Sequence, residues 1–395
     1  MLQGTLAAPS INFQGDLGTG IFSPGPGQIA LAQNGNLFAH GSSLDLSAAL
    51  GQNALALSTG LQNVAVGFNA LAANTNGLGN VAVGFNALSA NTIGGGSVAV
   101  GADALANHTT GSENVAVGHR ALTSLTTGQV NTALGAGALS SNLSADGNTA
   151  VGFNSQATHQ TGNQNTAVGS EALKENATGV DNTAVGATAL VFGGGSRNTA
   201  VGRQALGTLF TGSNDDNIAL GYQAGNALTV GSNNVFIGSS GIAGDNDTIR
   251  LGGTHTHTFV AGIRGVTTGV ADGIPVLVDS AGQLGTVSSS RRFKFDIADM
   301  GDASSGLMRL RPVTFRYKQP TADGSHPLQY GLIAEEVAEV NRDLVVYEPD
   351  GQALTVKYNL LPALLLNEVQ RQQRTIDELT RRLEELERRL TTQQR

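Results

Sequence analysis

A short apolar segment returns at a nearly constant interval along residues 47–253. The nine residues NVAVGFNAL begin at Asn63 and again at Asn80, and the related SVAVGADAL follows at Ser97. Most successive starts keep the interval that separates Asn63 from Asn80, and a weaker copy, SAALGQNAL, begins at Ser47. Such self-similarity indicates an architecture of stacked structural repeats. The remaining starts are Asn114, Asn131, Asn148, Asn165, Asn182, Asn198, Asn217 and Asn234.

Each copy predicts one short strand followed by a turn. The x-A-V-G core is β-branched and alternates with period two, while stretches such as N-A-T-G between cores supply turn residues. One copy is then one coil of a β-solenoid, and a dozen coils at a strand spacing of ~4.8 Å give a shaft of about 55 Å. We expect the repeated Asn to bond turn backbone or to stack as a ladder between coils, with ligand or ion binding as the alternative.

Composition favours a thin architecture built from several chains. Gly accounts for 54 of 395 residues, aromatic residues for 5%, and Trp is absent. Because Ala and Gly fill a large core poorly, we expect the coils to need neighbouring chains, with one strand face inside the coil and one against another chain. The predicted fold class is mainly β: a β-solenoid or β-roll shaft in a homotrimer, then a small α+β domain and a C-terminal coiled-coil helix. The repeats resemble the heads of trimeric adhesins and phage fibres.

The N-terminal segment predicts a small β region. Residues 15–36, GDLGTGIFSPGPGQIALAQNGN, favour two short strands around a Pro/Gly turn and resemble segments of phage tail-fibre proteins. No Lys or Arg precedes Asn63. A structural attachment role is expected for this region.

Composition changes sharply near Ser288. Of the 22 basic residues, 17 follow residue 253, and seven of the 18 aromatic residues lie between Phe293 and Tyr358. This segment can build a conventional mixed core. We predict strands near 313–318 and 344–347, a helix around 332–340, and a long helix from residue 360 onward.

The last helix carries a heptad pattern. Its apolar positions alternate three and four residues apart, with one polar intruder, and such a narrow seam on a charged helix requires partner helices. The heptads alone do not fix the number of strands. The predicted seam consists of Val369, Gln372, Ile376, Leu379, Leu383, Leu386 and Leu390.

Four motifs in order, SSSRRFKFDI, LRPVTFRYK, YGLIAEEVAEV and LTVKYNLLPALLLNEVQRQQ, resemble the intramolecular chaperone, or S74 peptidase, family of endosialidases and tail spikes. The resemblance covers roughly Ser288 to Arg395 and implies that the domain trimerises its fibre and then cuts itself off. The family pattern places a nucleophilic Ser five residues before a Lys, which corresponds to Ser289 and Lys294. Cleavage would then fall between Ser288 and Ser289. The family commonly has Asp where this chain has Ser290, and Ser290 is the alternative nucleophile.

The implied chemistry is a single-turnover serine endopeptidase. A lysine amine that is removed from water can accept the serine proton, and the hydroxyl then attacks the peptide bond on its own N-terminal side. The competing interpretation is a polar linker with solvated Arg and Lys. We predict no other enzymatic activity.

These patterns predict four segments. They are an N-terminal attachment segment (1–46), a repeat shaft (47–253), a β connector (254–287) and a chaperone-like domain (288–395), with the coiled coil from about residue 364.

Net charge and the absence of targeting signals limit the classes of partner and the location that we expect for this chain. The net charge of -8 and pI near 5.3 argue against nucleic acid, and no Cys is present for disulfides or thiolate metal sites. The N-terminal sequence shows no signal peptide, and no membrane-spanning apolar run is found. This favours assembly in a host cytoplasm and a place on a virion or other extracellular particle; the alternative is a bacterial cell surface.

Two further groups are candidate sites. His255 and His257 in THTHTF share one face if they lie on a strand, so a trimer could hold an axial metal ion there; exposed strand histidines are the alternative. No other cofactor is predicted. Asp215, Asp216, Asp245 and Asp247 are expected to serve turns, rather than to bind Ca²⁺ or cleave glycans.

The leading hypothesis is a receptor-binding fibre or spike subunit of a phage tail or phage-like particle. Its partners would be two further copies of the chain, tail or baseplate proteins, and a bacterial surface glycan or protein. The alternatives are a bacterial trimeric adhesin and a depolymerase of surface polysaccharide.

Overall fold

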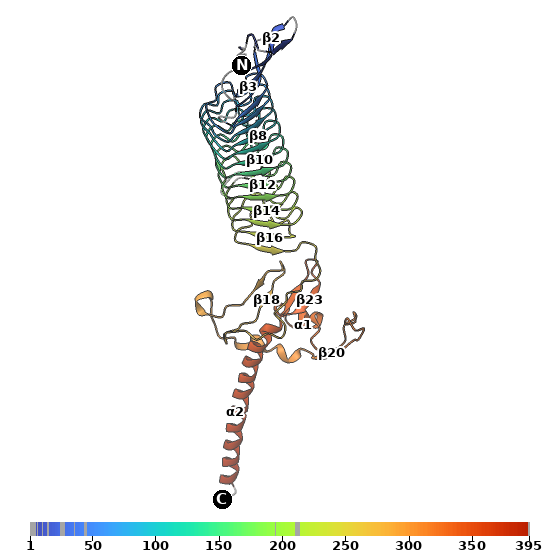
Figure 1. Cartoon of the computed structure of the whole chain (residues 1–395). Helices are drawn as coiled ribbons and strands as arrows, with labels where there is room; N and C mark the ends of the chain where they lie inside the picture. Colours follow the sequence, from blue (N-terminus) through green and yellow to red (C-terminus); the bar gives the residue numbers. More distant parts are fainter. Residues whose placement is uncertain are drawn as a thin grey trace. The chain divides into compact units, whose positions relative to one another are not determined.

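The computed structural model describes residues 5, 7–9, 11–13, 16–23, 28–34, 36–42, 46–193, 195–209 and 214–393. The chain divides into two compact units, Met1–Ala261 and Gly262–Arg395, which are described separately. The first unit is built of strands, and the second combines short strands with helices (Figure 1). The mainly β fold class with a β-solenoid and a long C-terminal helix is therefore confirmed. No helix within the described ranges is long and apolar enough to span a membrane.

Four antiparallel strands begin the first unit. Their neighbours pair in chain order, and the last of them pairs antiparallel with the first strand of the solenoid. The two strands predicted within residues 15–36 correspond to the second and third, whereas the Pro/Gly turn at residues 24–27 lies outside the described residues. The strands are β1 (Ile11–Phe13), β2 (Asp16–Phe22), β3 (Gln28–Gln33) and β4 (Asn36–Ser42).

The repeats form a parallel β-solenoid with one short strand per coil (Figure 1). Every strand pairs in register with the equivalent strand of the next coil, as Val81 does with Val98. The constant interval between repeats therefore fixes the register directly. The strands are β5 (Ala48–Leu50), β6 (Val64–Val66), β7 (Val81–Val83), β8 (Val98–Val100), β9 (Val115–Val117), β10 (Thr132–Leu134), β11 (Thr149–Val151), β12 (Thr166–Val168), β13 (Thr183–Val185), β14 (Thr199–Val201), β15 (Ile218–Leu220), β16 (Val235–Ile237) and β17 (Ile249–Leu251).

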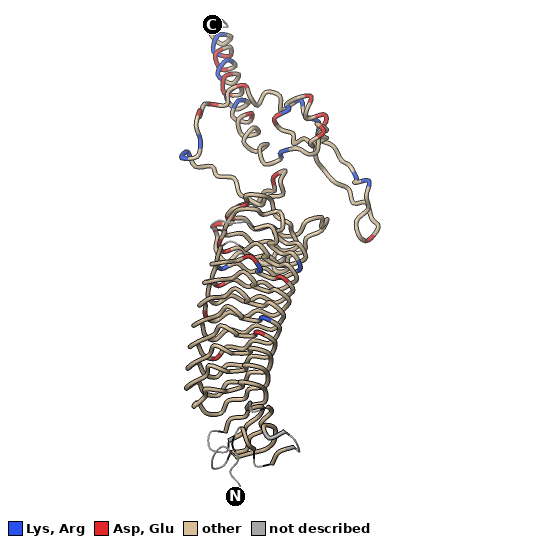
Figure 2. The backbone as a smooth tube through the Cα atoms, turned by 90° about the horizontal axis from the view of Figure 1, so that it is seen from above, with Lys and Arg blue, Asp and Glu red and all other residues tan. Residues whose placement is uncertain are grey.

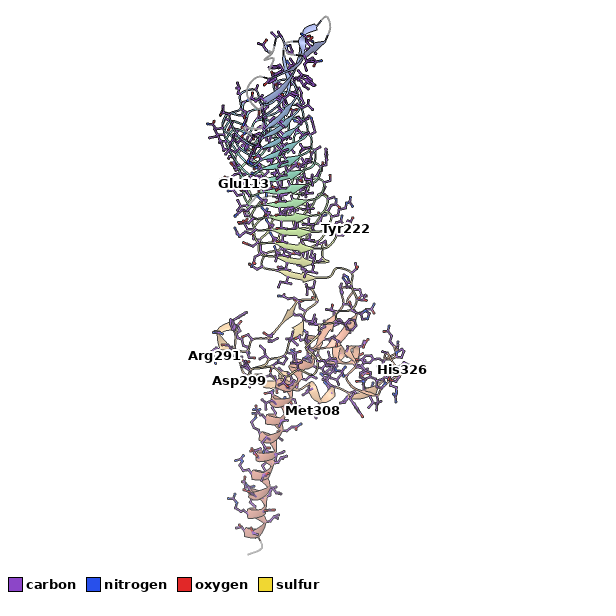
Figure 3. The ribbon with its side chains drawn as sticks, viewed as in Figure 1. Glu113, Tyr222, Arg291, Asp299, Met308 and His326 are labelled. Carbon is purple, nitrogen blue, oxygen red and sulfur yellow. The ribbon has the colours of Figure 1, made fainter. Side chains whose placement is uncertain are left out.

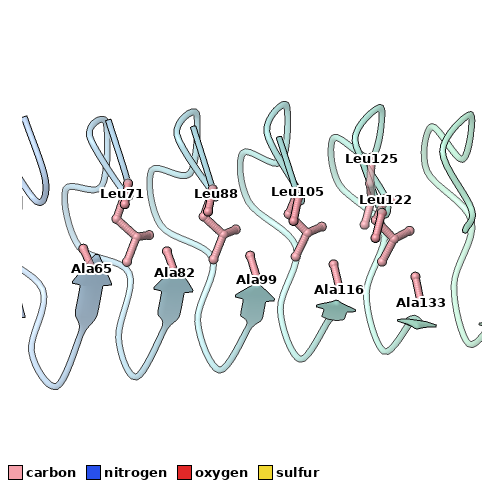
Figure 4. Packing of buried hydrophobic residues seen from close by; sticks show 14 of the residues in the cluster. Ala65, Leu71, Ala82, Leu88, Ala99, Leu105, Ala116, Leu122, Leu125 and Ala133 are labelled. Carbon is pink, nitrogen blue, oxygen red and sulfur yellow. The ribbon is translucent and has the colours of Figure 1, made fainter. Parts of the chain in front are cut away.

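Stacked Ala and Leu side chains fill the interior of the solenoid. In each coil from β6 to β15 the central Ala of the strand is fully buried, and a Leu after the following turn packs beside it in most coils (Figure 4). These leucines have left-handed backbone conformations, with φ of 51° at Leu88 and 52° at Leu105. That conformation costs a leucine roughly 1–2 kcal/mol, which full burial of its side chain, worth about 1.5–3 kcal/mol, offsets.

The repeated Asn forms the predicted ladder. The Asn63 Oδ1 accepts the backbone N–H of Asn80 at 2.9 Å, and the Asn63 Nδ2 donates to the Gly77 carbonyl at 2.8 Å. Asn80 repeats the second contact with Gly94 at 2.8 Å. Each amide thus satisfies turn backbone and links adjacent coils, so the structural interpretation of the repeated Asn is confirmed.

The solenoid closes its own core within one chain. The Ala, Leu and Asn columns are buried in the single chain, so one strand face lies inside the coil as expected. The cover expected from a neighbouring chain on the other face stays a prediction. The first and third residues of each strand point outward. The third residues form an unbroken apolar column, here called the outer stripe, and none of them is buried. The outer stripe comprises Leu50, Val66, Val83, Val100, Val117, Leu134, Val151, Val168, Val185, Val201, Leu220, Ile237 and Leu251.

The second unit has a small core and a long helix. Val337, Leu344, Val345 and Val356 are buried together, and further apolar residues pack around them. The predicted strands and helices near 313–318, 344–347 and 332–340 all form, with slightly shorter bounds. The strands pair as antiparallel hairpins: β18 (Leu277–Val278) with β19 (Leu284–Gly285), β20 (Val313–Phe315) with β21 (Gln329–Gly331), and β22 (Val345–Tyr347) with β23 (Ala353–Val356). The helices are α1 (Ala334–Val340) and α2 (Leu361–Gln393), with short 3-10 helices at η1 (Arg291–Phe293), η2 (Gly301–Ser304), η3 (Leu307–Arg309), η4 (Arg342–Leu344) and η5 (Tyr358–Leu360).

Charged side chains are distributed unevenly between the two units. They are sparse along the solenoid, whereas acidic and basic residues alternate along α2 (Figure 2). On α2 they form ion pairs within the helix, such as Arg381 with Glu378 at 2.7 Å and Arg389 with Glu385 at 2.7 Å. Such pairs support an exposed helix surface by a few tenths of a kcal/mol each.

Candidate functional site

The predicted cleavage segment forms a single 3-10 turn. The Ser290 carbonyl accepts the Phe293 N–H at 3.1 Å, and the Arg291 carbonyl accepts the Lys294 N–H at 3.0 Å. Arg291 projects away from the backbone at this turn (Figure 3). The turn shortens the path between Ser289 and Lys294, but their side chains form no hydrogen bond within this described segment.

Both proposed catalytic side chains are exposed in the single chain. Every residue from 253 to 300 is exposed, including Ser289, Ser290 and Lys294. A lysine serves as a general base when its amine is removed from water. The single chain gives Lys294 no such cover.

Lys294 is flanked in the sequence by two aromatic residues, and both are exposed. Phe293 is 62% exposed and Phe295 is 87% exposed, while the Arg292 guanidinium lies 4.7 Å from the centre of the Phe293 ring. A further chain that covered these rings would also restrict the access of water to the adjacent Lys294.

A polar cluster anchors the beginning of α2 to η2. Asn367 donates from Nδ2 to the Ser304 Oγ at 2.7 Å, and Ser304 donates to the Glu368 carboxylate at 3.1 Å. Arg371 then pairs with Asp302 at 3.0 Å. This cluster orients the helix on the domain. Sequence reasoning missed it, because its two sides come from distant parts of the chain and share no local pattern.

The predicted seam of α2 is exposed along its whole length. Its six apolar side chains are 52–60% exposed, whereas Val, Leu and Ile side chains are most often buried in folded proteins. Near the seam, Arg382 donates from Nε to Glu378 of its own chain at 2.8 Å. The structure brings the seam residues onto one helix but gives them no partner within the described chain.

The candidate metal histidines do not lie on a strand. β17 ends at Leu251, so the expected strand face for His255 and His257 is wrong. The His255 Nδ1 accepts the Gly253 N–H at 3.2 Å, and the His257 Nδ1 lies 2.9 Å from the Thr256 hydroxyl. Within the described part of the chain, no three His, Asp or Glu residues come together to hold a metal. An axial ion would need imidazoles from several chains, and it stays a prediction.

The acidic residues of the solenoid turns have structural partners. Arg197 donates from Nε to Asp216 at 2.7 Å, which lowers the pKa of Asp216. Arg250 likewise donates to Asp245 at 2.7 Å and lowers the pKa of that carboxyl. Asp247 accepts from the Asn233 Nδ2 at 2.7 Å. These contacts agree with the turn role predicted for these acids.

The comparisons identify one domain. Residues 289–346 match the family model described as chaperone of endosialidase, peptidase S74. Searches of the curated proteins and of the solved structures find no match to the chain. The matched range begins at Ser289 and includes Lys294, α1 and the β20–β21 hairpin, whereas all of α2 follows it. The predicted resemblance is therefore confirmed for this range, and a β-solenoid followed by such a domain fits a fibre or spike subunit with a C-terminal chaperone.

Proposed function

We propose that this chain is one subunit of a homotrimeric fibre or spike on a phage tail or phage-like particle. The solenoid forms its shaft, and the chaperone domain brings three chains into register before cutting itself off. Tail or baseplate proteins would hold the assembled fibre, and a bacterial surface receptor would be its target. The apolar surface that a single chain leaves uncovered is the observation that carries this proposal.

The segment from 253 to 300 supplies part of that surface. None of its side chains is buried in one chain, although many are large and apolar. Soluble monomers rarely expose contiguous apolar patches beyond a few hundred Å². Burial between chains explains this composition without any other partner. The exposed residues include Phe259, Val260, Ile263, Val266, Val270, Ile274, Val276, Val278, Leu284, Val287, Phe293, Phe295 and Ile297.

The heptad seam of α2 and the outer stripe of the solenoid support the same interpretation. A heptad seam is buried only by partner helices that run alongside it. The outer stripe is a continuous apolar column on the surface, and large exposed apolar patches mark sites of association. Three chains satisfy both requirements, and the chaperone-of-endosialidase match favours three rather than two.

Assembly would also switch on the cleavage chemistry. Once Phe293 and Phe295 are covered by neighbouring chains, the Lys294 amine loses its water and can take the Ser289 hydroxyl proton. The Ser289 oxygen then attacks the Ser288 carbonyl carbon, and the proton passes to the departing Ser289 amine. Water hydrolyses the resulting ester and leaves a Ser288 carboxylate. Cleavage therefore reports that the trimer has formed.

A bacterial trimeric adhesin would share the solenoid and the outer stripe. The match to a chaperone of endosialidase favours the particle, because a self-cleaving maturation domain suits a fibre that is finished before use. The axial metal at His255 and His257 remains an additional proposal within either assembly.

A denaturing gel of freshly expressed protein tests the cleavage. We expect a fragment of residues 1–288 from the wild type and an intact chain from Ser289→Ala. Ser290→Ala is the matched control, because it removes the neighbouring hydroxyl and should leave cleavage intact. Loss of cleavage in Ser290→Ala alone would move the nucleophile to Ser290, and an intact wild-type chain would rule out self-cleavage.

A further inference from the structure

A shallow polar trough runs along the outside of the solenoid across five successive coils. It consists of two adjoining hollows of about 420 and 360 Å³, which share His119, Arg120 and Thr123. Asn86 lies at one end and Phe153 at the other. No strand residue lines the trough, so it is distinct from the outer stripe, which the trimer would cover. Figure 3 shows Tyr222, from the same column of coil positions as His119 and Phe153, projecting outward from the solenoid.

We propose that this trough binds an acidic oligosaccharide. Arg120 lies where the two hollows meet, is exposed, and forms no ion pair with any residue that the structure describes. A guanidinium presents a planar pair of N–H donors that fits a carboxylate in a bidentate manner. The carboxylate of a sugar acid therefore matches the Arg120 guanidinium at the centre of the trough.

The remaining lining suits the rest of a sugar chain. Hydroxyl and amide groups of Asn107, Ser140 and Asn154 offer both donors and acceptors to sugar hydroxyls. The Phe153 ring is 56% exposed, and its apolar face can support a pyranose ring. Phe153 belongs to the second coil after Arg120, roughly 10 Å along the solenoid at the usual strand spacing. An extended glycan can therefore reach both groups.

Gly137 lines the trough together with Arg120 and Asn154. It belongs to the same column of coil positions as Asn86, Asp103, Arg120 and Asn154, where its neighbours carry polar side chains. A Cβ at Gly137 would lie 2.2 Å from the Asn154 Oδ1. The Asn154 amide therefore occupies the space that a side chain at Gly137 would take, and a side chain there would displace this amide.

The residues that line the trough favour a glycan ligand over a protein partner. They also favour binding of the glycan over its hydrolysis. Protein interfaces concentrate their energy in a desolvated apolar centre, and this trough has a charged one. Glycoside hydrolysis uses two facing carboxylates, whereas Asp103 is the only carboxylate among the trough residues, all of which are described. The Asp103 Oδ1 already accepts from the Asn86 Nδ2 at 3.2 Å.

This inference rests on the proposed fibre, because three parallel troughs would add avidity to a weak single site. The test is an array of acidic and neutral bacterial oligosaccharides, probed with protein whose trimeric mass has first been confirmed. We expect binding to uronate- or ulosonate-containing glycans. Arg120→Gln should weaken it at least tenfold, and Arg120→Lys should retain part of it.

Two variants separate recognition from general charge or folding effects. Gly137→Asn fills the trough without changing charge, in a left-handed conformation that Asn86 and Asn154 already adopt in this column, and should abolish binding. Arg197→Gln removes one positive charge at another corner of the coil and should leave glycan binding unchanged. Absence of acidic glycan binding by the wild-type trimer, or binding that Arg120→Gln and Gly137→Asn leave unchanged, would overturn the site but not the fibre. Capture of a bacterial surface protein without any acidic glycan would assign the receptor to another class and also overturn it.

Discussion

His108 is an ionisable side chain placed inside the solenoid. It is 0% exposed, and its Nε2 lies 3.1 Å from the Asn114 Nδ2. Burial lowers its pKa to about 4, against a weaker opposing effect of the Gly128 carbonyl. In the preceding coil the equivalent position holds Asn91, and in the following coil Leu125. The interior column therefore accepts polar and apolar residues, but it is a poor environment for a charge.

His108 should make the solenoid less stable in mild acid. Between about pH 6.5 and pH 4 the unfolded chain takes up a proton at His108 and the folded chain does not, so stability falls as pH decreases through this range. The loss is up to about 3 kcal/mol per chain. His108→Asn, which copies the residue of the preceding coil, should remove this contribution. Urea unfolding of the wild type and of His108→Asn at pH 7 and pH 4.5 measures this difference in stability. An equal pH dependence of the two proteins would show that His108 is not responsible.

At the scale of the coil, one glycine column sets how closely the coils stack. Gly101, which follows β8, has φ of +136°, and a Cβ there would lie 2.5 Å from the Gly118 carbonyl oxygen of the next coil. Equivalent glycines recur after most strands with similar values. Neither the conformation nor the close approach leaves room for a side chain.

Gly101→Ala should therefore destabilise the solenoid by about 2 kcal/mol or more, from backbone strain and the clash together. Gly96→Asn is the matched control. Its φ is +66°, and the same position holds Glu113 and Asp181 in other coils with φ of 60° and 58°. That control should change the free energy of unfolding by less than about 0.5 kcal/mol. Similar losses in both variants, measured by denaturant unfolding, would show that the glycine column does not control stacking.

The strands were predictable from the sequence because their period is constant and the Asn and Gly turns mark each coil. The leucines with positive φ were not, since leucine disfavours that conformation and only the closed coil imposes it on Leu88 and Leu105. In the second unit, the order of motifs predicted the strands and α1. The hydrogen bond between Ser304 and Asn367 could not be predicted, because these residues are far apart in the sequence and share no local pattern.

At the scale of the whole molecule, the candidate catalytic site is incomplete in one chain. The resemblance to the S74 family predicts Ser289 and Lys294 as the catalytic pair, and the structure shows both exposed. In the proposed trimer, contacts between chains would bring the serine and the amine together, and no pattern within one sequence encodes such contacts. The same contacts would bury residues 253–300 and the α2 seam.

The mass of the native assembly tests this account most directly. Ser289→Ala keeps the domain attached, so sedimentation equilibrium at micromolar concentration should give three times the 40.2 kDa of one chain. Leu379→Asp together with Leu386→Asp should abolish that trimer, while Thr380→Asp, outside the seam, should preserve it. A folded Ser289→Ala protein that sediments as a single 40.2 kDa chain would contradict the account.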